Sequence, residues 1–417
     1  MITDLKTMFP STDPTPEWDS AAPRAALRPL HVYLLFFGWT MFSVFLYARF
    51  STLGDSRSYL TGAYDDESDL RTIVIQKIAN TIFSIVHVEL IAHLLFAAFA
   101  ATGVIYMIRH ARFHGRYHWL LLALLFTPNF GVWASVVGRE AIFVGLMGLF
   151  LGAVLAYWHR PAFHQLLLAL SCVAGMIFIR APYGVGVALF FLMFLLYRSG
   201  PRMYLSTGVQ ALLFIVACVL ALMVVWPHVD GYINEEVLPK AQHYFTRSSD
   251  TTRTWVQVDT TFGLLTSLWW SLPLALIGPT PAEVLARPLT LPFFLSGVVV
   301  FGSLLYSVGM AFRAPAGRVR KVLLLGWLPA VIVILIAYVP FGIYNSGSAI
   351  RYASCFLPFL IFPSMLLSAV SAEATDGSAV PVPRRARLGP TRAQEPLQRQ
   401  PAAMESQAMG SQPGWIR

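Results

Sequence analysis

Apolar segments of about membrane-spanning length recur along the chain and limit the folds that it can adopt. Of its 417 residues, 56% are hydrophobic and only 12% are charged. A soluble domain of this size needs more polar surface than that. A hydrocarbon core of ~30 Å takes about 20 residues of helix. We therefore expect an all-α, polytopic integral membrane protein with ten transmembrane helices, at 31–50, 86–108, 118–134, 140–158, 165–180, 183–198, 204–226, 291–312, 321–340 and 352–370.

The loops between these segments alternate in charge, which predicts the orientation of the chain. Cytoplasmic loops of membrane proteins carry an excess of Lys and Arg. A cytoplasmic N-terminal tail (1–30) puts every strongly basic loop on the same side, and none of these loops contains Asp or Glu: 109–118, 159–164, 198–202 and 313–321. The C-terminal segment 371–417 is rich in Pro, Ala, Gln and Arg. It is expected to be a disordered cytoplasmic tail that contacts anionic lipid through Arg384, Arg385 and Arg387.

Two apolar segments are expected to lie at the outer surface, within the external loops 51–85 and 227–290. Residues 70–86 have apolar side chains at helical spacing, which predicts an amphipathic interfacial helix. Residues 261–277 are apolar enough for an eleventh span, but a crossing there would move the basic loop 313–321 to the outside. We interpret 261–277 as a re-entrant or interfacial piece with Trp269 and Trp270 at the headgroups.

An acidic stretch directly after the first apolar segment is the most unusual polar feature. It holds five carboxylates, Asp55, Asp65, Asp66, Glu67 and Asp69. The four later acids are typical of a solvated loop that also starts the following helix, because acids favour a helix N-terminus. Asp55 differs, because it lies a few residues past the membrane exit between Gly54 and Ser56. We take Asp55 as the candidate catalytic acid.

Three separated arginines are predicted to share the outer face with Asp55: Arg139, Arg180 and Arg351. A guanidinium is a permanently charged planar fork that matches phosphate, and it is costly near lipid without a partner. Each arginine could instead contact lipid headgroups, and Arg139 could pair with Glu140. A lipid-linked phosphate would suit the set. Asp55 would then act as a general base on a hydroxyl or as a ligand of a divalent cation.

The second apolar segment contains His87, Glu89 and His93. Glu89 and His93 are four residues apart and share one helical face. Ionisable groups at this depth could form a metal pair or a proton relay. A structural pair in the bundle interior is favoured, because no third ligand stands at the spacing of a metal motif.

Five short motifs give the chain a resemblance to the GT-C-type polytopic glycosyltransferases, including bacterial members near the polysaccharide polymerases. GDSRSYL (54–60) is similar to the acidic motif of the first external loop, and FIRAPYG (178–184) to an Arg-Pro segment that ends a span. GPTPAEV (278–284) is similar to a Gly-Pro-x-Pro loop. The remaining two motifs are a hairpin with Pro128, Trp133, Ser135, Arg139 and Glu140, and a segment with Asn345, Gly347, Arg351 and Tyr352.

The resemblance implies inverting transfer of a sugar from a polyprenyl-phosphate or polyprenyl-diphosphate donor at the external, periplasmic face of a bacterial plasma (inner) membrane. It implies that Asp55 deprotonates the acceptor and that Arg139, Arg180 and Arg351 bind the phosphate, with a divalent cation as a candidate cofactor. The supporting residues would be Ser56, Tyr59, Glu140, Asn345 and Tyr352. The partners would be the lipid-linked sugar, the bilayer and a polysaccharide-assembly complex, with no nucleic acid.

Three alternatives remain open at this point. The chain could be an O-antigen or exopolysaccharide polymerase, in which the arginines do the main work. It could be a transporter or flippase for lipid-linked sugars, which would place charges at the midplane of several spans. Only His87, Glu89 and His93 lie that deep, and this favours chemistry at the surface. A structural subunit of an assembly complex is the third alternative.

Overall fold

The computed structural model describes residues 28–51, 53–64, 69–113, 117–198, 206–246 and 251–378, and almost all of them are helical. Residues up to Ala374 form one compact unit. Within the described ranges, the β-type pairing is a single antiparallel bridge between Thr252 and Asn345. The predicted tail 1–30 lies outside the description up to residue 27. The tail predicted from 371 begins within a helix, α19 (Phe362–Ser378), and its remainder lies outside the described residues.

Seven helical segments are long and apolar enough to cross a membrane, counted over the described residues. This confirms an all-α chain with several membrane-length helices. The segments are Pro29–Arg49 (α1 Pro29–Met41, η1 Phe42–Leu46, η2 Tyr47–Arg49), α4 (Glu89–Ala111), α7 (Arg139–His159), α9 (Ala181–Arg198), Thr261–Ala286 (α12 Thr261–Ile277, α13 Pro281–Ala286), Pro288–Arg313 (η5 Pro288–Thr290, α14 Leu291–Arg313) and Arg318–Gly342 (α15 Arg318–Lys321, η6 Val322–Trp327, α16 Leu328–Gly342).

Two of the ten predicted spans are not continuous helices. The segment 118–134 divides into α5 (His118–Leu125) and α6 (Pro128–Ala134), because Thr127 precedes a proline and adopts an extended conformation. The segment 352–370 is divided between α17 (Ser346–Ala353), α18 (Leu357–Leu360) and α19, and prolines stand at the start of the new helices. The predicted spans at 165–180 and 204–226 correspond to α8 (Phe163–Ile179) and α10 (Thr207–Tyr232).

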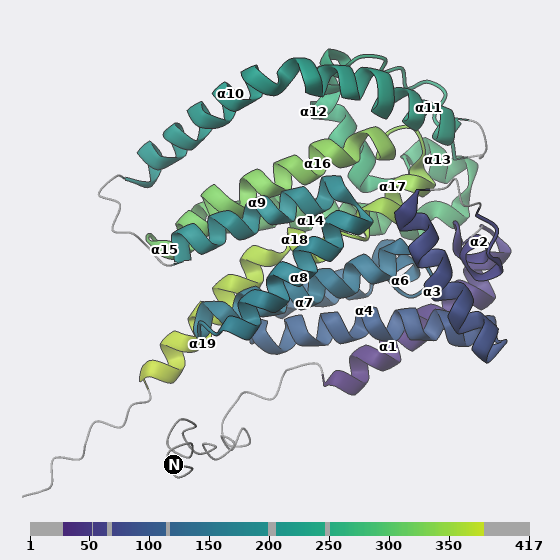
Figure 1. Cartoon of the computed structure of the whole chain (residues 1–417), viewed down its shortest axis with the longest axis horizontal. Coiled ribbons are helices and arrows are strands. Elements are labelled where there is room, and N and C mark those ends of the chain that lie inside the picture. The colour runs from purple at the N-terminus through teal and green to yellow at the C-terminus, as the bar shows by residue number, and fades with distance from the viewer. Residues whose placement is uncertain are drawn as a thin grey trace, which may run out of the picture. The chain divides into compact units, whose positions relative to one another are not determined.

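The centre of the bundle is the packing of α4 against α7, and α8, α9 and α16 follow in series (Figure 1). Glycines allow the backbones of α4 and α7 to meet. A Cβ added at Gly148 would lie 2.3 Å from the carbonyl carbon of Gly103. Small residues commonly permit such close helix contacts in membranes. These packed helices form the frame of the bundle.

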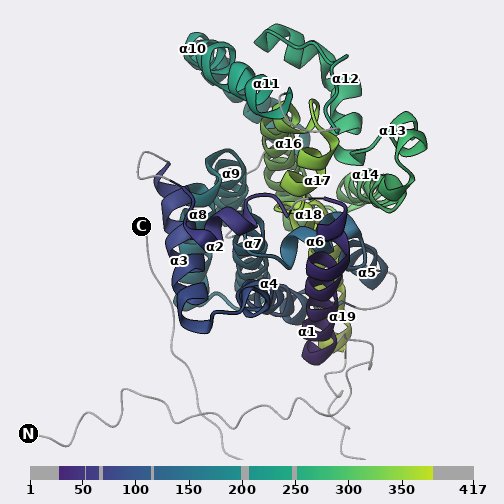
Figure 2. The same ribbon diagram turned by 90° about the vertical axis from the view of Figure 1, so that its right-hand side faces the viewer.

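The short helices that carry the sequence motifs gather at one end of this frame. Figure 1 shows α2 (Ser56–Thr61), α3 (Leu70–Val86), α6 and α17 at the right-hand end, and Figure 2 views that end directly. The basic helix α15 lies at the opposite end. These four helices therefore lie at the end of the bundle away from α15, and the orientation of that end in a membrane stays a prediction.

The helix α3 has the bounds predicted for an interfacial helix. It packs through Thr72, Ile75 and Ala79, whereas Leu70 and Ile85 on the predicted apolar face are exposed. An exposed apolar face suits contact with lipid. The position of α3 relative to a membrane stays a prediction.

The helix α12 is long and apolar enough to count among the candidate spans. However, the residues just before it and just after it are both linked by hydrogen bonds to the segment 342–344, at the end of α16. The Tyr344 hydroxyl donates to the Val258 carbonyl over 2.7 Å, just before α12. Just after α12, the Gly278 carbonyl accepts from Arg253, which also donates to the Gly342 carbonyl. Such flanks are compatible with a re-entrant or interfacial helix, so the interpretation of 261–277 stays a prediction.

Candidate functional site

The turn before α2 places Asp55 beside the start of α7. Gly54 has a φ of +60°, a conformation that glycine adopts without strain. The Ser56 hydroxyl is within hydrogen-bonding distance of two carbonyls, Val137 at 2.6 Å and Leu53 at 2.7 Å. Ser56 therefore connects the turn to the loop before α7, and the neighbouring Asp55 side chain stays partly exposed.

Four charged side chains from distant parts of the chain form a continuous set, which we call the carboxylate–arginine network: Asp55, Glu140, Arg180 and Arg351. Arg351 Nη2 donates to Asp55 Oδ2 over 2.7 Å, and its Nε donates to Glu140 Oε1, also over 2.7 Å. Arg180 Nη2 donates to the same Glu140 oxygen over 2.5 Å. Three predicted phosphate-binding or catalytic residues are thus connected through Glu140, a predicted supporting residue.

The network has a buried end and an accessible end. The Glu140 side chain is 2% exposed, and Arg180 and Arg351 are 12% and 14% exposed. Asp55 is 41% exposed. Burying charges is costly unless they are paired, so Glu140 is needed to neutralise the arginines. Asp55 is the carboxylate of the network that a ligand can reach.

The charge on Arg351 is secured by its neighbours. Burial would lower the pKa of Arg351, but Glu140 and Asp55 outweigh this effect and hold the pKa well above its usual value. Arg351 is therefore charged at every physiological pH. It also lies 5.5 Å from the centre of the Trp133 ring, a cation–π distance.

Arg139 makes a separate branch beside the network. Its Nε donates to the Tyr59 hydroxyl over 2.8 Å, and its Nη2 donates to the Thr72 hydroxyl. Burial raises the pKa of Tyr59, and Arg139 opposes this effect only in part, so the phenol is neutral. The alternative of an Arg139–Glu140 pair is not what the described residues show, because Glu140 bonds to Arg180 and Arg351 instead.

Aromatic side chains border the arginines and the acid. The Arg180 guanidinium lies 4.1 Å from the centre of the Tyr352 ring. The ring of Tyr64 lies 5.4 Å from that of Tyr59, and burial together with the charge of Asp55 raises the pKa of Tyr64. Tyr64 and Thr72 are site neighbours that the sequence reasoning missed. For Thr72, the signal was its place on one helical face with Ile75 and Ala79.

Asn345 has a structural role and has no hydrogen bond to the charged residues of the network among its described contacts. Its side-chain oxygen accepts from the Ser348 amide over 3.0 Å and from the Thr251 hydroxyl over 3.0 Å. This is an N-cap, which fixes where α17 begins. Because Arg351 is in the last turn of α17, Asn345 helps to position it.

The pair of Glu89 and His93 supports the hairpin that carries Arg139. The buried His93 Nδ1 accepts from the Val137 amide over 2.9 Å, and its Nε2 lies 3.5 Å from Glu89 Oε1. His93 fits the structural interpretation, but Glu89 begins α4 with a side chain that is 54% exposed, so the pair does not lie in the bundle interior as predicted. Within the described ranges, there is no group of three or more His, Cys, Asp or Glu side chains that could hold a metal ion. Asp55 and Glu140 both face Arg351, so we derive no step through a cation.

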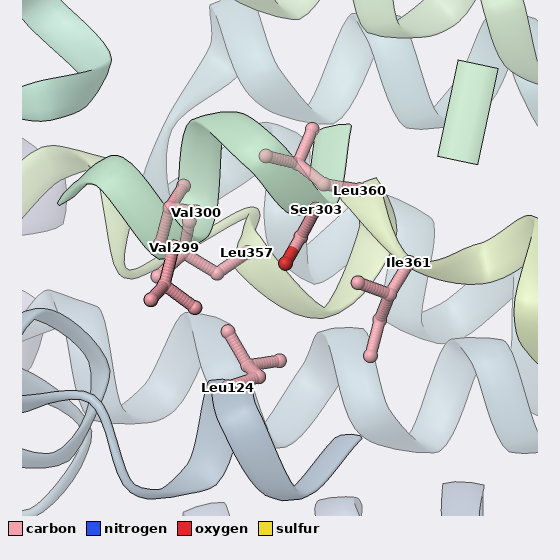
Figure 3. Close-up of a pocket in the computed structure, with 7 residues that line it drawn as sticks. All are labelled: Leu124, Val299, Val300, Ser303, Leu357, Leu360 and Ile361. Carbon is pink, nitrogen blue, oxygen red and sulfur yellow. The ribbon is translucent and has the colours of Figure 1, made fainter. Parts of the chain in front are cut away.

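A small hollow between α5, α14 and α18 has no charged lining (Figure 3). It is lined by Leu124, Val299, Val300, Ser303, Leu357, Leu360 and Ile361. None of the network residues borders it. This hollow is therefore not part of the candidate site.

Four of the five motifs behind the resemblance meet in this region and contribute Asp55, Glu140, Arg180 and Arg351. The fifth motif, at 278–284, contains Glu283, which forms an ion pair with Arg253 outside the network. In comparisons with known proteins, no family model, no curated protein and no solved structure matches this chain.

Proposed function

We propose that this chain is a membrane glycosyltransferase of the GT-C type. It would move a sugar from a polyprenyl-phosphate or polyprenyl-diphosphate donor to an acceptor hydroxyl at the external face of a bacterial plasma membrane. The observation that carries the proposal is the exposed Asp55 carboxylate in contact with Arg351, whose other partner is the buried Glu140.

The charge balance of the site supports an anionic substrate. The network and its Arg139 branch contain three arginines and two carboxylates, and the described contacts of Arg139 are to neutral hydroxyls. One positive charge is therefore left over where water is partly excluded, and there it attracts an anion more strongly than in bulk solvent. A phosphate presents the oxygens that guanidinium groups bind in pairs.

The proposed reaction uses the exposed Asp55 as the base and the buried arginines as the phosphate-binding groups. The donor phosphate would take the place of Asp55 on Arg351 and so release the carboxylate. The acceptor oxygen then attacks the anomeric carbon as Asp55 takes its proton, and the bond from that carbon to the phosphate oxygen breaks. The electron pair of this bond goes to the phosphate, whose developing charge the arginines stabilise.

The same geometry supports a polymerase as a second candidate. Asp55 is neutralised by Arg351 in the structure, as it would be where arginines do the main work. A deletion strain distinguishes the two functions. Accumulation of single repeat units indicates a polymerase, whereas a polymer that lacks one sugar indicates a glycosyltransferase.

The proposal is tested by Asp55→Asn in membranes supplied with a polyprenyl-phosphate-linked radiolabelled sugar. Loss of general-base catalysis typically costs about 10²–10⁴ in rate. Asp69→Asn is the matched control, because Asp69 is also an exposed acid but pairs with Arg71 outside the network. Wild-type transfer by Asp55→Asn at a normal protein level would overturn the proposal.

A further inference from the structure

A second group of basic side chains lies at the end of the bundle opposite the network. We call it the Trp158 cluster, and it consists of Trp158 at the end of α7, Arg198 at the end of α9 and Arg318 at the start of α15. Arg198 Nη2 donates to the Trp158 carbonyl over 3.3 Å. The Arg318 guanidinium lies 5.5 Å from the centre of the Trp158 ring. Arg198 and Arg318, about 120 positions apart, thus both contact Trp158, the first at its main-chain carbonyl and the second at its ring.

The arginines of this cluster have only neutral partners within the described part of the chain. The Arg198 guanidinium also lies 4.5 Å from the centre of the Tyr157 ring, but its Nε is buried without a hydrogen-bond partner. The Nε of Arg320, on the same short helix as Arg318, is also buried without a hydrogen-bond partner. A buried donor without an acceptor is destabilising, and more so when the group is charged. The described partners of Arg198 and Arg318 are thus all neutral, and the positive charges of the cluster attract an anion.

The position of the cluster indicates which anion it would bind. All three residues lie at ends of membrane-length helices, at the level where tryptophan and tyrosine meet lipid headgroups. In the turns before Arg198, α9 exposes Leu192 and Leu196, an apolar surface that acyl chains can cover. Basic pockets between transmembrane helices suit anionic headgroups.

We propose that the Trp158 cluster binds the phosphodiester of an anionic phospholipid, such as phosphatidylglycerol. Arg198 donates from its guanidinium to one phosphate oxygen, and Arg318 contacts the phosphate from α15. The site joins α7, α9 and α15, so its occupancy stabilises this end of the bundle. The proposal does not depend on the glycosyltransferase function, because it shares no residue with the network.

The test uses the full-length protein in detergent, with native mass spectrometry after addition of phosphatidylglycerol or phosphatidylcholine. We expect wild-type protein to retain phosphatidylglycerol in preference, and Arg198→Gln to reduce this retention by at least about tenfold, the equivalent of one charged hydrogen bond. Arg318→Gln is the second variant. Arg318 is exposed, so this change leaves the packing intact even if Arg198→Gln does not fold.

Arg313→Gln is the matched control, because Arg313 is an exposed arginine at the same end of the bundle. It should retain phosphatidylglycerol as the wild type does. Equal retention of the two lipids, or an equal loss in Arg313→Gln, would overturn the site. A separate thermal unfolding series with inorganic phosphate distinguishes the sources of the anion. Stabilisation by free phosphate as strong as that by the lipid would overturn the assignment to a headgroup.

Discussion

Arg351 and Asp55 are 296 positions apart in the chain, yet Nη2 of the arginine lies 2.7 Å from Oδ2 of the acid. The contact joins the turn before α2 to α17, just before the last apolar helices. Gly54 makes it possible, because an added Cβ there would lie 2.5 Å from Arg351 Nη1. The contact between Arg351 and Asp55 thus depends on a residue without a side chain at position 54.

Gly54→Ala should therefore displace Arg351 and impair activity more than folding. The left-handed conformation costs an alanine about 1–2 kcal/mol, and the methyl group adds a clash with the guanidinium. We expect transfer from a lipid-linked sugar to fall well below the wild-type rate while the protein still inserts and melts cooperatively. Gly309→Ala is the control, since nothing lies within 4 Å of its added Cβ. Equal activities of the two variants would contradict this role of Gly54.

Glu140→Gln should be more destabilising than any other neutralisation in the network. Glu140 is the shared partner of Arg180 and Arg351, and removing one member of a buried ion pair typically costs about 3–5 kcal/mol. Asp55→Asn should cost less than about 1 kcal/mol, because the Asp55 side chain is 41% exposed and solvent screens its charge. Thermal unfolding of both variants in the same detergent compares them. Similar melting temperatures would show that Glu140 does not carry the buried charge.

The charged residues of the site were the predictable part of the structure. In so apolar a chain, ionisable groups are few, and the alternation of basic loops assigns most of them to one side. That reasoning selected Asp55, Arg180 and Arg351, which the structure connects through Glu140. The sequence could not predict which charged residue pairs with which, because the pairing depends on how each helix is rotated about its axis.

Arg139 and Glu140 illustrate this limit. They are adjacent at the start of α7, and adjacency left an ion pair between them as one alternative. Successive residues on a helix point about 100° apart, however, since a turn takes 3.6 residues. Glu140 therefore faces the buried arginines, and Arg139 faces α2 and α3. The continuous spans predicted at 118–134 and 352–370 failed for another reason, because hydropathy does not register the breaks before Pro128 and Pro358.

Arg253→Lys should destabilise the fold although Arg253 was not selected from the sequence. Its side chain is 1% exposed, and its Nε and Nη2 lie 2.9 and 3.0 Å from the two oxygens of Glu283. It also donates to the carbonyls of Gly342 and Ile343, just before α17. A lysine has no planar fork to replace these bonds, so we expect a loss of about 3–5 kcal/mol, as for a broken buried pair.

The measurement is a double-mutant cycle with Glu283→Gln, followed by thermal unfolding. A positive coupling energy for Arg253→Lys with Glu283→Gln is expected, because the two side chains contact each other. Arg287→Lys, at an exposed arginine nearby, serves as the control and should melt as the wild type does. Additive effects of the first two changes would show that the pair does not act as a unit.

The packing of α4 against α7 determines whether the network can assemble at all, because Arg139 and Glu140 begin α7. A Cβ at Gly148 would lie 2.3 Å from the carbonyl carbon of Gly103, so Gly148→Ala must push the two backbones apart. Overpacking of this kind typically costs about 1–3 kcal/mol. Gly38→Ala adds the same methyl group to α1 with nothing within 4 Å, and it should leave the melting temperature unchanged. If Gly148→Ala also melted as the wild type does, the two helices could not be in the close contact that positions Glu140 between Arg180 and Arg351.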